Sequence, residues 1–82
     1  MLGEIVFMNY LSSLNIGDKV KIERIDDSLE LKERLIDMGF TKDSEIECIL
    51  KACFNGPIAY RIKNTTIALR RRDAKHILVN SL

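Results

Sequence analysis

The sequence contains no tryptophan, one proline, one histidine and two cysteines among its 82 residues. A domain of this size that depended on disulfides would usually carry more cysteines. Cys48 and Cys53 are separated by four residues, a spacing that matches neither the C-x2-C of zinc knuckles nor a redox motif. We therefore interpret both as ordinary core or surface residues. Together with His76 they are weak candidates for a transition-metal site, which would need further ligands.

Catalytic motifs are also missing. Spacing supports no Ser, His and Asp arrangement, and no G-x-x-x-x-G-K phosphate loop occurs. We expect His76, next to Lys75, to lie at the surface of a short turn. Asp26 and Asp27 are better explained by helix capping than by acid–base chemistry. The sequence thus predicts a protein that is not an enzyme.

No apolar run is long enough to span a bilayer. The opening MLGEIVFMNYL is interrupted by Glu4 and lacks the basic start and small-residue cleavage site of a signal peptide. We treat residues 1–10 as an N-terminal extension with three open roles: a frayed end, an extra edge strand, or a dimer contact through Ile5-Val6-Phe7. We expect a cytoplasmic protein, and self-association stays open.

The net charge of +1 conceals an asymmetry. Residues 1–50 carry 11 acidic and 6 basic side chains, whereas residues 51–82 carry 1 acidic and 7 basic side chains, including the run Arg70-Arg71-Arg72. Packing of the two halves either neutralises this separation in part or leaves one basic face.

Five short segments alternate apolar and polar residues, as half-buried strands do. They cover residues 19–23, 45–50, 58–63, 66–69 and 77–79. In the second segment we expect Ile46, Cys48 and Leu50 to point inward. Asn55-Gly56-Pro57 predicts a hairpin loop, since Asn and Gly tolerate positive φ and Pro cannot donate a ladder hydrogen bond. Asn64-Thr65 predicts another tight turn.

A helix is predicted after the first of these strands. Asp27 or Ser28 would cap its start, and Asp27 with Glu30 resembles a capping box. Gly39 stands where a left-handed residue ends a helix. The stripe that faces the core consists of Leu31, Leu35 and Met38.

Leu29 and Ile36 lie on another side of this helix. They either cover a second part of the core or form an exposed apolar pair for a partner. After the arginines, Ala74 and Ile77 have the spacing of a single helical turn. The order strand, helix, three strands, short helical turn, strand predicts a mainly β fold with an inserted helix, in the form of a small antiparallel barrel.

Several segments, in this order and at this spacing, resemble the FeoA family. They are RLIDMGF (34–40), IEC (46–48), NGPIAYRI (55–62), IALR (67–70) and DAKHILV (73–79). The resemblance runs from about Leu11 to Val79, so we assign 11–82 to a single FeoA-like domain. It implies an SH3-like barrel and a small cytoplasmic protein of bacterial ferrous iron uptake that acts on the membrane transporter FeoB, which has a cytoplasmic GTP-binding domain. Similar domains occur at the C-terminus of iron-responsive DNA-binding repressors.

The sequence departs from the family pattern at three turn positions. Cys53 stands where the family hairpin has proline, and Asn55 replaces a glycine, which Asn can do at positive φ. Asp43 stands where the family usually has a turn glycine. The proline replacement loosens the loop and adds a thiol.

We therefore expect a protein-binding module that binds or modulates the GTPase region of FeoB without a required cofactor, with weak Fe²⁺ binding left open. The partner-binding candidates are Leu29, Ile36, Phe54, Asn55, Gly56, Pro57, Arg70, Arg71 and Arg72. Arg71 and Arg72 are expected to be exposed. Two alternatives remain: a transition-metal-binding regulatory domain, or a nucleic-acid-binding module whose basic face combines the arginine run with Arg61, Lys63 and Lys75.

Overall fold

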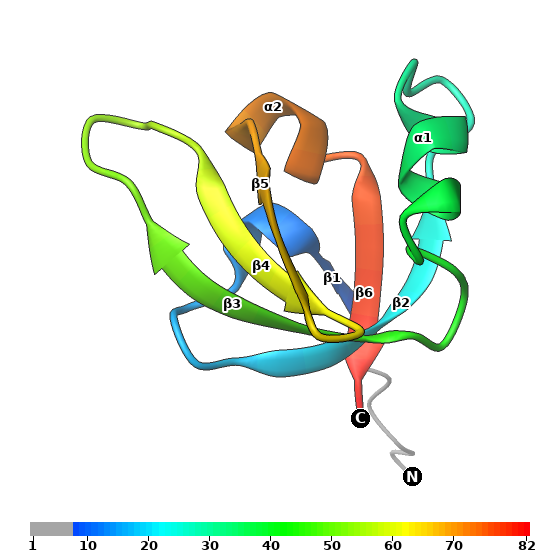
Figure 1. Ribbon diagram of the computed structural model, residues 1–82, viewed down its shortest axis with the longest axis horizontal. Coiled ribbons are helices and arrows are strands. Elements are labelled where there is room, and N and C mark those ends of the chain that lie inside the picture. Colours follow the sequence, from blue (N-terminus) through cyan, green and yellow to red (C-terminus); the bar gives the residue numbers. More distant parts are fainter. Residues whose placement is uncertain (1–7) are drawn as a thin grey trace, which may run out of the picture.

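The computed structural model describes residues 8–82, which form a strongly curled antiparallel sheet of six strands (Figure 1). The strand order is β1-β6-β2-β3-β4-β5, so β1 and β5 lie at the two ends of the sheet. The strands are β1 (Met8–Tyr10), β2 (Lys19–Ile25), β3 (Glu45–Lys51), β4 (Ile58–Ile62), β5 (Thr65–Leu69) and β6 (Ile77–Ser81). This confirms the predicted mainly β architecture with an inserted helix.

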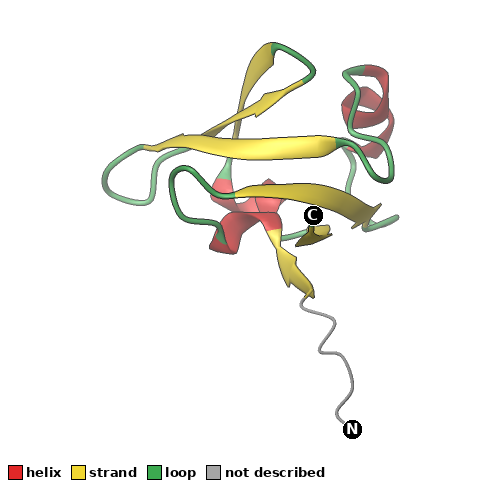
Figure 2. Ribbon diagram, turned by 90° about the horizontal axis from the view of Figure 1, so that it is seen from below, coloured by secondary structure: helices red, strands yellow, loops and turns green. Residues whose placement is uncertain are grey.

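Three short helical segments accompany the sheet. They are the 3₁₀ turn η1 (Leu11–Ser13), α1 (Lys32–Asp37) and α2 (Arg71–Ala74). The connection that contains α1 joins β2 to β3 at one side of the sheet and contributes Leu29, Leu35 and Phe40 to the core, whereas η1 and α2 lie side by side (Figures 1 and 2).

Strand β1 gives part of the N-terminal extension a defined place. Met8 lies opposite Asn80 and Tyr10 opposite Leu78, so this segment is an extra edge strand on β6. The dimer contact expected at Ile5-Val6-Phe7 lies outside the described residues.

The core contains Tyr60, whose ring is fully buried as its alternation on β4 predicts. Its hydroxyl donates a hydrogen bond to the main-chain carbonyl of Leu11, at 3.0 Å, and so joins β4 to η1. The other buried members are Leu11, Leu14, Ile22, Ile25, Leu29, Leu35, Phe40, Ile46, Cys48, Ile58, Ile62, Leu69, Ala74, Ile77 and Val79.

The predicted start of the helix is wrong. The helix begins at Lys32 and has no side-chain cap. Asp26 instead accepts a hydrogen bond from the backbone N–H of Ser28 at 3.0 Å, and its carbonyl accepts one from Leu29 at 3.1 Å. Asp27 pairs with the Lys32 ammonium. Because this turn inserts Leu29 into the core first, the helix starts one turn later than its capping signals suggest.

The predicted end of the helix is confirmed. Gly39 has a φ of 107°, and its N–H bonds to the carbonyl of Ile36 at 3.0 Å. The Phe40 N–H bonds to the carbonyl of Leu35 at 2.9 Å, and both side chains are buried. These are the paired bonds and the apolar contact of a Schellman motif. Met38 remains exposed, so the predicted core stripe ends at Leu35.

Strand β3 departs from its predicted alternation near its end. Cys48 lies opposite Tyr60, but Leu50 lies opposite Ala59, so β3 contains one extra residue. This bulge turns Leu50 outward, where 58% of it is exposed, while Ile46 and Cys48 point inward as expected. The prediction that Leu50 faces the core is wrong for this reason.

The β4–β5 turn lies one residue earlier than predicted. Lys63 and Asn64 take left-handed φ angles of 50° and 66°, and Ile62 lies opposite Thr65. This is the φ pattern of a two-residue type I′ turn, whose twist matches that of the flanking strands. Thr65 therefore belongs to β5.

Candidate functional site

Residues 52–57, called the hairpin loop below, connect β3 to β4. The Gly56 N–H bonds to the Cys53 carbonyl at 3.0 Å and closes a tight turn around Phe54 and Asn55. These two residues have φ angles of 57° and 60°. The positive φ expected at Asn55 is confirmed. Phe54 shares it, although a left-handed conformation costs a residue with a Cβ about 1–2 kcal/mol.

The φ of Gly56 is not positive, so its backbone conformation does not require glycine. Glycine is needed here because a side chain has no room. A Cβ atom at this position would lie 2.8 Å from the Cβ of Ala52 and 3.1 Å from the carbonyl oxygen of Cys53. Contacts this short require the loop to move. The predicted hairpin loop is confirmed, but Gly56 serves close packing, and the left-handed geometry is taken by Phe54 and Asn55 instead.

Arg71 is tied to the hairpin loop, which corrects the expectation that it is a free surface cation. Its Nε donates to the carbonyl of Gly56 at 3.0 Å, and its Nη2 donates to the carbonyl of Ala52 at 3.2 Å. The side chain is half-buried. It thereby links α2 to both sides of the loop.

Arg70 and Arg72 flank this tether and are exposed, as predicted for Arg72. Both contribute to a groove of about 370 Å³ that is also lined by Asn55, Gly56 and Pro57. Neither forms an ion pair with another described residue. The fold thus brings two of the predicted candidate groups together. We call Phe54–Pro57 with Arg70 and Arg72 the loop–arginine surface.

A second groove, of about 570 Å³, lies on the other side of the same arginines. Arg70 and Arg72 meet Arg34 and His76 there, and Leu29 contributes to the floor but is only 9% exposed. The His76 ring lies 3.4 Å from the Asp26 carboxylate. The remaining residues that line this second groove are Ser28, Glu30, Leu31, Ala68, Leu69 and Asp73.

Hydrogen bonds hold the Asp26 side chain in its charged form beside this second groove. The backbone N–H of Ser28 contributes most to lowering the pKa of the Asp26 carboxyl, followed by the Ser28 side chain and His76. A charged Asp26 keeps one carboxylate next to His76, beside a groove that three arginines line together with Glu30 and Asp73.

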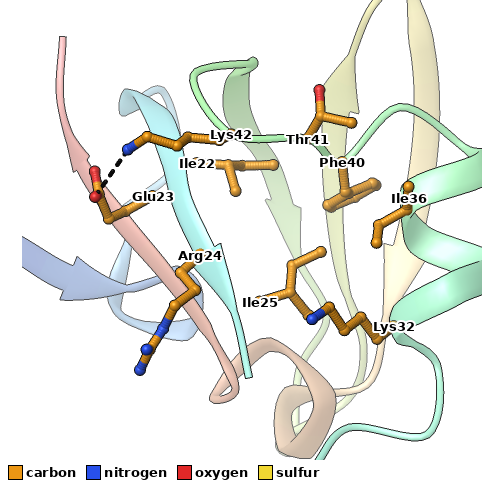
Figure 3. A pocket seen from close by; sticks show the side chains of 9 residues that line it. All are labelled: Ile22, Glu23, Arg24, Ile25, Lys32, Ile36, Phe40, Thr41 and Lys42. Atoms are coloured by element: carbon orange, nitrogen blue, oxygen red, sulfur yellow. Dashed lines mark hydrogen bonds and ion pairs between the residues drawn. The ribbon is translucent and has the colours of Figure 1, made fainter. Parts of the chain in front are cut away.

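Ile36 lies away from Leu29, and the two alternatives left open for them divide: Leu29 covers part of the core, whereas Ile36 is exposed. Ile36 is 40% exposed and lines an apolar groove of about 510 Å³ between α1 and β2, together with Ile25 and Phe40 (Figure 3). Lys32 and Lys42 lie at the edge of this groove. Leu29 belongs to the turn that precedes α1 and is buried, whereas Ile36 belongs to the helix itself, so the two do not share a helix face.

The cations of β4 do not extend the loop–arginine surface. Arg61 lies opposite Glu47 in the β3–β4 register. Arg61 and Lys63 line a separate groove that also contains Glu45 and Glu47. The single basic face considered for nucleic acid therefore does not form from these residues, because Arg61 and Lys63 share their groove with two carboxylates.

The weak metal-site candidates lie in different environments. Cys48 is fully buried, and burial raises the pKa of its thiol. Cys53 is exposed in the hairpin loop, and His76 lies beside Asp26. Across residues 8–82, no three His, Cys, Asp or Glu side chains are grouped as ligands for a metal ion.

The FeoA domain model matches residues 10–81, nearly all of the described chain. The chain belongs to the FeoA family. It is 35% identical over 69 residues to an Fe(2+) transport protein A/Fe(2+) transporter FeoB fusion protein of Porphyromonas gingivalis. That match covers 84% of this chain but only 8% of the relative. A putative Fe(2+) transport protein A of Campylobacter jejuni is 33% identical, over 85% of this chain and 95% of the relative.

The structure of FeoA from Stenotrophomonas maltophilia, described as an SH3 domain protein complexed with zinc, has the same fold. Its TM-score is 0.77 at 25% identity, with 87% of this chain and 88% of that chain covered. The predicted SH3-like architecture is thereby confirmed. No helix between Met8 and Leu82 of this FeoA domain has the length and apolar character required to cross a membrane.

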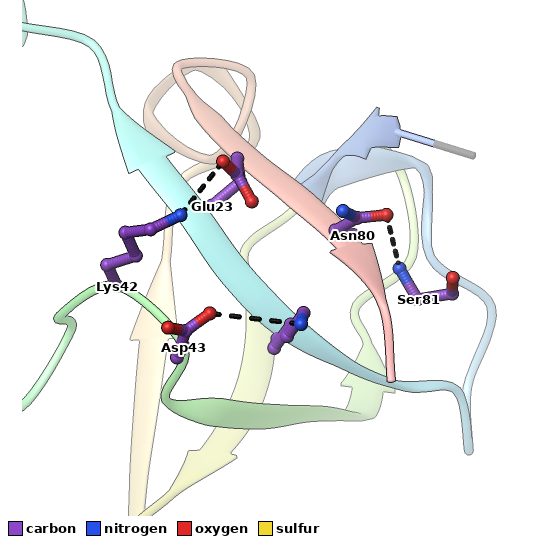
Figure 4. A network of polar contacts seen from close by, with 6 residues as sticks. Glu23, Lys42, Asp43, Asn80 and Ser81 are labelled. Atoms are coloured by element: carbon purple, nitrogen blue, oxygen red, sulfur yellow. Dashed lines mark hydrogen bonds and ion pairs between the residues drawn. The ribbon is translucent and has the colours of Figure 1, made fainter. Parts of the chain in front are cut away.

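Asp43 shows how this FeoA domain accommodates a family departure. It has a φ of 70°, a left-handed conformation that the family's usual glycine adopts without steric cost. Its N–H bonds to the carbonyl of Ile22 at 2.7 Å, and its carboxylate lies 3.9 Å from the Lys21 ammonium (Figure 4). These contacts stabilise the turn. Asp also tolerates the left-handed conformation better than most residues with a Cβ.

Proposed function

We propose that this FeoA domain is a cytoplasmic accessory protein of ferrous iron uptake that binds the GTP-binding region of a FeoB-type transporter. The observation that carries the proposal is the fusion protein of Porphyromonas gingivalis, whose FeoA part aligns with 84% of this chain. A covalent link raises the effective concentration of one domain near another, which benefits domains that contact each other.

The loop–arginine surface supports a binding role. An apolar residue with a charged rim is a common arrangement at protein interfaces. Phe54 supplies the apolar part, while Arg70 and Arg72 are exposed cations without ion-pair partners among residues 8–82. The role requires no bound cofactor and no chemistry by the domain itself.

A titration tests the proposal. The protein is titrated by calorimetry with the isolated GTP-binding domain of the FeoB-type transporter encoded in the same genome, at low salt. We expect saturable binding with a Kd of about 10 μM or tighter, in the range of ordinary transient complexes. Absence of binding at that concentration would contradict the proposal.

Two double variants with equal changes of charge make the titration specific. Arg70→Glu with Arg72→Glu should weaken binding, since it reverses the charges beside the hairpin loop. Lys19→Glu with Lys63→Glu changes the net charge equally in the groove lined by Glu45 and Glu47. This control should bind like the wild type, after circular dichroism shows that both variants are folded.

A further inference from the structure

Phe54 occupies a position that folding does not favour. Its side chain is fully exposed, at 101%, the largest value among the large apolar side chains of the described residues. Its backbone also takes a left-handed φ of 57°. An aromatic side chain in water gains nothing from the hydrophobic effect, and strained residues of this kind persist where surrounding structure holds them, often at functional sites. The exposure of this ring therefore suggests a use outside the folded domain.

Three sets of contacts hold the hairpin loop in place. The Ala52 N–H bonds to the Pro57 carbonyl at 3.0 Å, and Gly56 packs directly on Ala52. Arg71 bonds to the carbonyls of Ala52 and Gly56, which lie on the two sides of the tip. Rigid presentation of a side chain reduces the entropy lost when it binds. Arg71 is the only one of these holding groups that comes from outside the loop and its strands.

The surroundings of Phe54 indicate what kind of surface would receive it. Arg70 and Arg72 line a groove with the loop and lack carboxylate partners among the described residues. Guanidinium groups recognise carboxylates through paired hydrogen bonds. A nucleic acid would instead be favoured by a longer basic track with several stacking rings. Among the described aromatic side chains only Tyr10 and Phe54 are exposed, and Arg61 and Lys63 lie in another groove, so the described surface offers no row of stacking rings along the arginines.

We propose that Phe54 is an anchor that enters an apolar pocket with carboxylates at its rim on the protein partner, and that Arg71 is the positioning residue for this anchor. The inference rests on the proposed function, since the partner is the FeoB-type GTP-binding domain. Arg71 acts through its two hydrogen bonds to the loop, while Arg70 and Arg72 meet the carboxylates. Arg71 therefore positions the loop, whereas its neighbours Arg70 and Arg72 contact the partner.

The anchor is tested by replacing Phe54 with Ala and measuring affinity for the isolated GTP-binding domain. Truncation of an aromatic anchor weakens binding by about tenfold to thirtyfold. Ile16→Ala removes another exposed apolar side chain, 59% exposed, from a different turn and should leave the affinity unchanged. Phe54→Leu should recover part of the loss, because it restores apolar volume.

The positioning role is tested by comparing Arg71→Met with Arg72→Met. Both variants lose one positive charge, but only the first loses the hydrogen bonds to Ala52 and Gly56. We expect faster amide hydrogen exchange at Asn55 and Gly56 in Arg71→Met alone. Its affinity should fall by about threefold to tenfold.

A double-mutant cycle separates positioning from direct contact. If Arg71 acts only through the anchor, Arg71→Met should have little further effect once Phe54 is Ala. An additive loss in the double variant would overturn the positioning role, as would unchanged loop exchange in Arg71→Met.

The outcomes distinguish this inference from the proposed function. Wild-type binding that Phe54→Ala leaves within twofold would overturn the anchor while the proposed function stands. No binding by the wild type would overturn both. Binding of mixed-sequence single-stranded DNA or RNA that Phe54→Ala abolishes, in the absence of binding to the GTP-binding domain, would overturn the protein-partner assignment.

Discussion

Tyr60 places one polar atom, its hydroxyl oxygen, in the apolar core, where the hydroxyl needs a hydrogen-bond partner. Its ring is fully buried, and its hydroxyl reaches the carbonyl of Leu11. Burial raises the pKa of the phenol far above its ordinary value, so the hydroxyl keeps its proton and donates at all physiological pH values. Without that donor, the Leu11 carbonyl would keep only the longer hydrogen bond from the Leu14 N–H, at 3.3 Å.

Replacing Tyr60 with Phe tests this hydrogen bond. The variant keeps the ring but removes the shorter of the two hydrogen bonds to the Leu11 carbonyl, and we expect the free energy of unfolding to fall by about 1 kcal/mol. Urea denaturation measures the change. Tyr10→Phe removes a hydroxyl from a side chain that is 52% exposed and should change stability by less than about 0.5 kcal/mol. Equal effects of the two variants would show that the Leu11 contact does not matter.

Among the elements, β3 combines buried and exposed apolar residues in one strand. Ile46 and Cys48 face the core, but the bulge before Leu50 turns the remaining strand over. The hairpin loop begins directly after this strand end, at residue 52, and a bulge bends the strand that carries it.

Two truncations in β3 test this change of face. Ile46→Ala should lower the free energy of unfolding by roughly 3 kcal/mol, because it leaves a cavity in the core. Leu50→Ala removes a side chain of similar size from the surface and should cost less than about 0.5 kcal/mol. Thermal or urea unfolding of both variants measures the difference. A large loss in Leu50→Ala would mean that β3 continues its alternation without a bulge.

The turn between α1 and β3 is joined to β2 by surface ion pairs (Figure 4). The Lys42 ammonium lies 3.0 Å from the Glu23 carboxylate and lowers the pKa of that carboxyl, first by its hydrogen bond and then by its charge. The unfolded chain therefore takes up a proton at this carboxyl at a higher pH than the folded chain does.

This shift gives a pH dependence of known sign. The stabilisation by Glu23 is present above its unfolded pKa, about 4.3, and is lost as the pH falls through the lower folded value. Glu23→Gln should therefore reduce stability at pH 7 but not at pH 2. Urea titrations at both pH values measure this. The control is Asp37→Asn, which alters an exposed carboxylate without a described ion pair. If Glu23→Gln changed stability equally at both pH values, the linkage would be excluded.

For the whole molecule, packing decides which charges remain available. Arg61 faces Glu47 across neighbouring strands, and His76 approaches Asp26 from the opposite half of the sequence. Arg70 and Arg72 keep no ion-pair partner within residues 8–82 and stay at the surface. The fold thus places these two exposed cations beside the hairpin loop.

This distribution predicts how salt affects association. Between about 50 and 300 mM salt, screening should slow wild-type binding to the GTP-binding domain, while dissociation changes less. The Arg70→Glu and Arg72→Glu double variant should bind more slowly and lose this dependence or reverse it. Stopped-flow or surface-based kinetics measures both rates. A wild-type association rate that is indifferent to salt would argue against a carboxylate-rimmed partner site.

Local sequence signals predicted the elements whose causes are local. The alternation of Ile58, Tyr60 and Ile62 predicted β4 correctly, and Gly39 marked the end of α1. The same signals failed at Asp27 and Leu50, because a turn and a bulge depend on how neighbouring segments pack. Capping preferences are too weak to determine a helix start when burial of Leu29 competes with them.

The candidate site was predicted only in part. The hairpin loop and the arginine run were both recognised, but their proximity depends on the connection from β5 to α2. Nothing in the order of residues distinguishes Arg71 from its two neighbours. Its two hydrogen bonds to the loop arise only after β4 and β5 bring residues 52–56 against α2.

The sequence by itself determined the class of fold, the family and the residue types available for binding, because periodicity and turn chemistry act over a few residues. The tertiary structure alone decided that Phe54 stands free, that Arg71 supports its loop, and that Arg70 and Arg72 keep their charge unpaired. The physical reason is that burial, ion pairing and strain depend on contacts between segments far apart in the chain, and such contacts exist only in the folded protein.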